Sequence, residues 1–65
     1  MFEREQLREE FADLLRSSRS SVAGIERLLA DLDAGDEALR THLGELHEHA
    51  ARHVSMLERL LEIVE

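Results

Sequence analysis

The chain has 65 residues, no cysteine and no proline, and its 15 acidic and 8 basic residues give a formal net charge of −7. This length predicts one domain with a core too small to be stable without further support. Without cysteine, disulfides and thiolate metal sites are excluded. Support must therefore come from self-association, a partner chain or a metal bound through nitrogen and oxygen.

All basic residues are arginines, and the excess of negative charge disfavours binding to nucleic acid or to an anionic membrane. No apolar run is long enough to cross a bilayer. Residues 1–5 carry mixed charges rather than the basic and then apolar pattern of a signal peptide. We therefore expect a cytoplasmic protein. The abundance of Leu, Ala, Glu and Arg, without strand-like alternation, predicts an all-α fold.

Residues 3–32 are predicted to form the first helix, because apolar residues recur there at alternating intervals of three and four. In heptad notation, position a holds Phe11, Ser18, Ile25 and Leu32, position d holds Leu7, Leu14, Ser21 and Leu28, and position e holds Leu15, Val22 and Leu29. The serine-rich residues 16–21 could break this helix and give three helices in all. The unchanged heptad phase across them favours one continuous helix.

Residues 33–36 are predicted to form a turn, in which Gly35 adopts the left-handed conformation and Asp36 caps the next helix. The second helix is expected over residues 37–64. Its position a holds Leu43, Ala50, Leu57 and Val64, and its position d holds Leu39, Leu46, His53 and Leu60. Because the connection is short, residues 1–65 should form a single antiparallel two-helix hairpin.

A wide apolar stripe predicts that this hairpin dimerises into a four-helix bundle. Two helices cover only part of such a stripe, so Leu15, Val22, Leu29, Val54, Leu61 and Ile63 should remain partly exposed in a single hairpin. A second copy would cover them, and two-fold symmetry is the commonest arrangement. The expected dimer core contains Phe11, Leu14, Leu15, Ser18, Val22, Ile25, Leu46, Ala50, His53, Leu57 and Leu60.

Histidines interrupt the stripe near its middle. Folding about Gly35 should place Ser18 opposite His53, and a two-fold axis near this level would bring two His53 side chains together. One interpretation is a hydrogen-bonded layer that fixes register. Another is a metal site built from His49 and His53 with their symmetry mates, with His42 nearby, since imidazoles at i and i+4 can bind Zn, Ni, Cu or Co. A third is a pH switch, because protonating two buried His53 side chains would drive the copies apart.

The sequence contains no HExxH or Glu-x-x-His motif and no convincing nucleophile–base–acid set, so we expect no enzymatic activity. The favoured function is that of a homodimeric module for protein–protein interaction, regulation or assembly, with no cofactor. Its net charge favours basic protein partners. The alternative is a metal-binding bundle that holds a divalent transition metal through His49 and His53.

Overall fold

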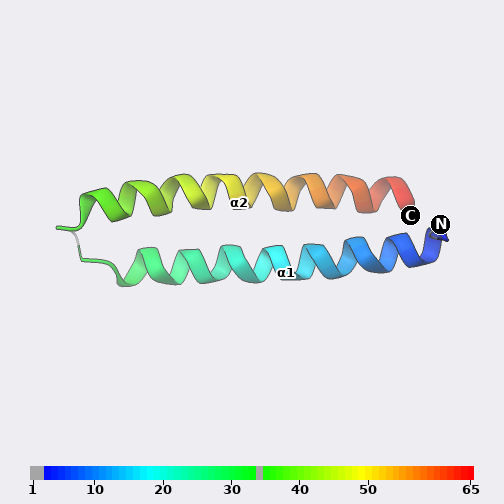
Figure 1. The fold of residues 1–65 in the computed structure, drawn as a ribbon, viewed down its shortest axis with the longest axis horizontal. Coiled ribbons are helices and arrows are strands. Elements are labelled where there is room, and N and C mark those ends of the chain that lie inside the picture. The colour runs from blue at the N-terminus through cyan, green and yellow to red at the C-terminus, as the bar shows by residue number, and fades with distance from the viewer. Residues whose placement is uncertain (1–2, 34) are drawn as a thin grey trace.

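The computed structural model describes residues 3–33 and 35–65. It contains two helices, α1 (Arg4–Asp31) and α2 (Glu37–Val64), which lie antiparallel and side by side (Figure 1). The molecule measures 50 × 17 × 14 Å. Its radius of gyration of 15.1 Å exceeds the roughly 11 Å of a compact domain of this length. The expected all-helical hairpin is confirmed.

The serine-rich segment does not interrupt α1. The Ser21 hydroxyl donates a hydrogen bond to the Ser17 carbonyl oxygen at 3.2 Å, so this side chain bonds within the helix rather than competing with it. The helix therefore continues in one phase from Arg4 to Asp31, as the heptad pattern indicated.

An arginine from the opposite helix holds the carboxyl end of each helix. Arg4 donates to the carbonyl oxygens of Val64 at 3.1 Å and Ile63 at 2.8 Å. Arg40 donates to the carbonyl oxygens of Leu29 and Leu32, both at 3.4 Å. Neither helix has a basic residue in its own last turn. The two arginines thus supply, across the hairpin, the positive charge that a helix carboxyl end favours.

The hairpin core is small. Only Leu15, Ile25 and Leu57 are buried among the described residues, and half-buried side chains at positions a and e continue the contact along both helices. The register follows the expected fold, because the Ser18 Oγ lies 3.5 Å from the His53 Nδ1. The predicted juxtaposition of Ser18 and His53 is therefore confirmed.

The prediction of partial exposure is wrong for Leu15, which is only 5% exposed. It is confirmed for Val22, Leu29, Val54 and Leu61, which are half-buried because these e positions lie toward the other helix. The helices meet along positions a and e, which turns the d positions outward: Leu14, Leu46, His53 and Leu60 are exposed. Ile63 is exposed as predicted. The expected dimer core therefore divides between the interior of the hairpin and one outer face.

The turn also differs from the prediction. Gly35 does not have the positive φ expected of it. Instead, Leu32 adopts an extended conformation with φ −72° and ψ 139°, which ends α1. The Asp36 backbone N–H donates to the Asp33 carbonyl oxygen at 3.1 Å. Asp36 occupies the N-cap position of α2, but its side chain makes no capping hydrogen bond.

Candidate functional site

Among the described residues, the large hydrophobic side chains that are exposed all lie on one face of the hairpin. The large hydrophobic residues that are 40–68% exposed among those described are Leu14, Leu28, Leu39, Leu46, Met56, Leu60 and Ile63. Each occupies heptad position d or g. We call the surface formed by positions d and g of both helices the d/g face. It consists of Leu7, Glu10, Leu14, Ser17, Ser21, Gly24, Leu28 and Asp31 of α1, and Leu39, His42, Leu46, His49, His53, Met56, Leu60 and Ile63 of α2.

Helix geometry explains why these positions form one surface. At about 100° per residue, position e lies about 40° to one side of position a, and position d lies about 60° to the other side. Since positions a and e point at the opposite helix, position d points sideways. Position g lies about 60° beyond position d, toward the outer edge of its own helix. The helices run antiparallel, which reverses the sense of rotation, and the d and g positions of both helices therefore emerge on the same side.

Charge separates the d/g face from the rest of the surface. None of the eight arginines occupies position d or g, and within the two helices only Glu10 and Asp31 bring a carboxylate to this face. Ion pairs between the helices belong to other positions. Arg19 Nη2 lies 2.9 Å from Glu58 Oε2, and His47 Nε2 lies 3.1 Å from Glu26 Oε2. The molecule thus has an apolar side and a charged side.

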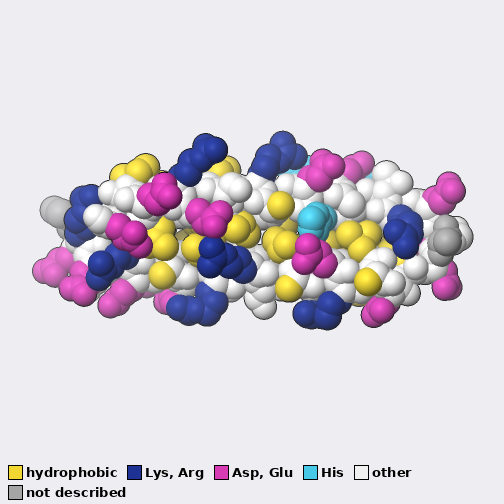
Figure 2. All heavy atoms as spheres, turned by 180° about the vertical axis from the view of Figure 1, so that it is seen from behind, with side chains coloured by type: hydrophobic (Ala, Val, Ile, Leu, Met, Phe, Trp, Pro, Cys, Tyr) yellow, Lys and Arg dark blue, Asp and Glu magenta, His cyan; other side chains and the backbone are white. Residues whose placement is uncertain are grey.

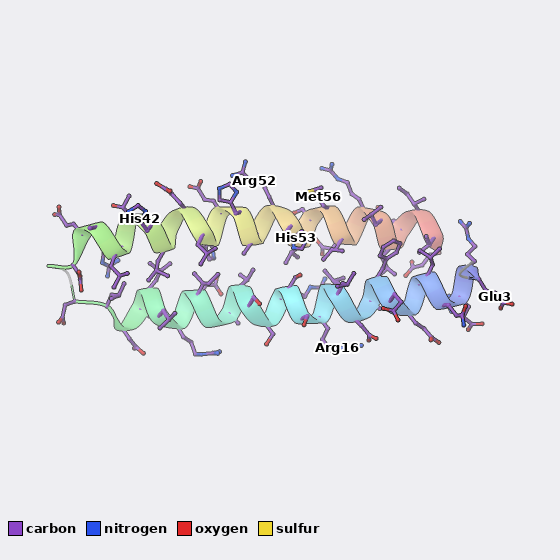
Figure 3. The ribbon with its side chains drawn as sticks, in the orientation of Figure 1. Glu3, Arg16, His42, Arg52, His53 and Met56 are labelled. Carbon is purple, nitrogen blue, oxygen red and sulfur yellow. The ribbon has the colours of Figure 1, made fainter. Side chains whose placement is uncertain are left out.

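Figure 2 shows the molecule from behind. Hydrophobic side chains are visible between the helices there, and arginine, acidic and histidine side chains lie beside them and partly between them. In Figure 3, His53 points from α2 toward α1, whereas Arg52 and Arg16 project from the outer edges of the hairpin.

Three of the four histidines lie on the d/g face. His42, His49 and His53 are all exposed, while His47 is half-buried beside Glu26 on the charged side. His49 and His53 are one helical turn apart and emerge from the same side of α2. His42 is two further turns toward the start of the helix. The described residues contain no group of three or more His, Cys, Asp or Glu side chains able to hold a metal ion. One hairpin therefore offers an imidazole pair at most.

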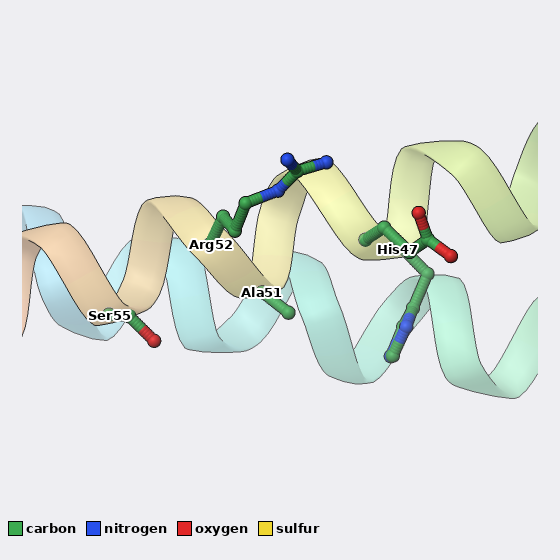
Figure 4. Close-up of a pocket in the computed structure, with 5 residues that line it drawn as sticks. His47, Ala51, Arg52 and Ser55 are labelled. Carbon is green, nitrogen blue, oxygen red and sulfur yellow. The ribbon is translucent and has the colours of Figure 1, made fainter.

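A shallow depression on the outside of α2 is a weaker candidate. His47, Glu48, Ala51, Arg52 and Ser55 line it, and its volume is about 440 Å³ (Figure 4). All five residues belong to one helix, so no second element closes over the depression. Binding sites for small molecules are usually deep and enclosed by several elements, and this depression is shallow and open.

Met56, at position g of α2, is a residue of the d/g face that the sequence did not mark as part of an interface, whereas Ile63 was expected to be covered by a second copy. Each flank of α2 holds two apolar residues, Val54 and Leu61 at position e and Met56 and Ile63 at position g. The sequence of α2 alone therefore does not distinguish the two flanks.

Fold and surface together define a class: an antiparallel helical hairpin with one broad apolar face and one charged face. Neither described helix contains a stretch that is long and apolar enough to cross a membrane. Comparison with protein families, curated proteins and solved structures finds no match for this chain.

Proposed function

We propose that this chain is a homodimerising helical hairpin, in which the d/g faces of two copies pack together to form a four-helix bundle. The bundle acts as a non-enzymatic module for protein–protein interaction. The observation that carries this proposal is the placement of every exposed large hydrophobic side chain, among the described residues, on the d/g face.

The exposed area supports the proposal. A folded monomer of 7.5 kDa is expected to expose about 4250 Å². This hairpin exposes 5179 Å². The excess of about 900 Å² is close to the roughly 800 Å² that each partner buries in a stable protein interface. One further layer of two helices therefore matches the area that the hairpin leaves uncovered.

A second copy is the occupant that the chemistry of the face favours. The face holds no arginine and few carboxylates, so two copies can approach without strong repulsion although each carries a net charge of −7. Positions a and d then become the bundle interior, as in other four-helix bundles. The charged side stays outside and leaves an acidic surface that suits basic protein partners.

The test is the molar mass in solution. Sedimentation equilibrium between about 1 and 100 µM should give a dimer for the wild-type chain and a monomer for Leu46→Glu, because the new carboxylate would be buried in the interface. Ala51→Glu adds the same charge to an exposed position of α2 outside the d/g face, and should leave the dimer intact. A wild-type monomer at 100 µM, or a Leu46→Glu variant that remains dimeric, would overturn the proposal.

A further inference from the structure

We propose that His49 and His53 of two copies form a four-imidazole site for one divalent transition metal ion at the centre of the dimer. This inference rests on the proposed dimer, because a single hairpin offers only two of the four nitrogens. The ligand class is a borderline metal that imidazole binds well, such as Zn²⁺, Co²⁺ or Ni²⁺.

The two histidines are arranged as a chelating pair. Their spacing of four residues places both imidazoles on one side of α2, separated by a rise of about 6 Å along the helix. Both side chains are exposed. Neither is in an ion pair within the described part of the chain, in contrast to His47, which contacts Glu26 at 3.1 Å. The nitrogens of His49 and the Nε2 of His53 are therefore open to an ion on the d/g face.

The surroundings of His53 favour coordination through Nε2. Its Nδ1 lies 3.5 Å from the Ser18 Oγ, which can accept a hydrogen bond from this nitrogen. Metal-bound histidines almost always donate their second ring N–H to a neighbouring oxygen, which fixes the tautomer and the ring orientation. Ser18 supplies this oxygen within the hairpin, before any metal binds.

Symmetry brings the two pairs together. A two-fold axis at the level of Ala51, near the middle of α2, aligns His49 of one copy with His53 of the second. The same axis aligns Leu46 with Met56 and Leu39 with Ile63 across the two α2 helices. On α1, it aligns Ser17 with Ser21, so that small polar residues surround the site.

Packing α2 against its symmetry mate also places most of its exposed apolar residues opposite one another. Five of the seven large hydrophobic residues that are exposed in the described part of the chain belong to α2. In this arrangement four of the five lie opposite another of the set. If α2 packed against α1 of the second copy instead, only Met56 and Ile63 would lie opposite leucines, and His49 and His53 would face serines. The metal site therefore specifies which helices pair.

The number of imidazoles matches tetrahedral coordination. Zinc and cobalt commonly take four ligands in protein sites, and the aligned imidazoles number four. The acidic surface raises the local concentration of cations around the bundle. A bound ion would hold the two hairpins together, because two of its ligands come from α2 of each copy.

The experiment titrates the full chain, freed of metal with EDTA and then dialysed, with Co²⁺ and Zn²⁺. We expect one ion per dimer by calorimetry, and for Co²⁺ the visible absorption of a tetrahedral complex. His49→Ala and His53→Ala should each weaken binding more than about tenfold, since losing even an outer-shell partner costs that much. His47→Ala, which removes an imidazole from the charged side of the same helix, should bind as the wild type does.

Sedimentation in EDTA separates this inference from the proposed dimer. A dimer in EDTA that binds no metal, or that binds equally well without His49 and His53, overturns the metal site and leaves the dimer standing. A monomer under all conditions overturns both. Metal binding with one ion per chain, undiminished in the Leu46→Glu variant, would also overturn the shared site.

Discussion

Substitutions of Leu46 and Leu57 test dimerisation directly, because both are leucines of α2 but only Leu57 is buried by its own chain. Leu57 is 5% exposed, whereas Leu46 is 51% exposed. Complete burial of a leucine side chain contributes about 1.5–3 kcal/mol. In an isolated hairpin Leu46 gains about half of that, so Leu46→Ala should cost about 1 kcal/mol. Leu57→Ala removes a buried side chain and should cost about 2–5 kcal/mol.

In the proposed dimer the two leucines become equivalent. The second copy covers the remaining half of Leu46, so Leu46→Ala should also cost about 2–5 kcal/mol per chain. Urea unfolding followed by circular dichroism at about 10 and 100 µM measures both costs. The unfolding midpoint of the wild type should rise with protein concentration, since dimerisation favours the folded state by mass action. A cost near 1 kcal/mol for Leu46→Ala, with a midpoint independent of concentration, would refute the reasoning.

Three further substitutions test separate parts of the structure. Arg40→Ala should lower the free energy of unfolding by about 1 kcal/mol, because the carbonyl oxygens of Leu29 and Leu32 lose their cross-hairpin donor; an unchanged urea midpoint would contradict the capping role. His53→Leu should stabilise the metal-free dimer, because it replaces a polar side chain in an apolar interface. The same substitution should abolish the visible absorption of bound Co²⁺. Destabilisation in EDTA would show that the contact of His53 with Ser18 contributes more to stability than the added apolar burial does. Arg19→Ala should cost less than about 1 kcal/mol, since its partner Glu58 is exposed to salt and water, and a larger loss in thermal melts would contradict that estimate.

The helical periodicity was sufficient to predict two helices and their antiparallel pairing. The short turn then set the approximate register, which is why Ser18 and His53 could be expected to lie opposite each other. The heptad phase also predicted that α1 continues through its serines. These features depend on local spacing and chain connectivity, both of which can be read directly from the sequence.

The contact face was harder to predict, because α1 has apolar residues at positions a, d and e. Such a stripe can pack through a and d or through a and e, and the choice depends on both helices together. In the hairpin, positions a and e meet, and Leu14 and Leu28 turn outward. Positions e and g of α2 each hold two apolar residues, so the sequence of α2 does not decide which flank meets α1.

The end contacts were beyond sequence reasoning. Whether Arg4 reaches the carbonyl oxygens of Ile63 and Val64 depends on the relative offset of two helices by a single turn. The spacing of residues predicts that offset only to within a few residues.

Arg4, in the first turn of α1, couples the opening of the two helix ends that it joins. Arg4 binds the last carbonyl oxygens of α2, so the first turn of α1 must be folded for the last turn of α2 to keep these hydrogen bonds. The opening of one terminus therefore loosens the other, although they are about sixty residues apart along the chain. Backbone amides in these two turns should exchange their hydrogens with deuterium as one unit.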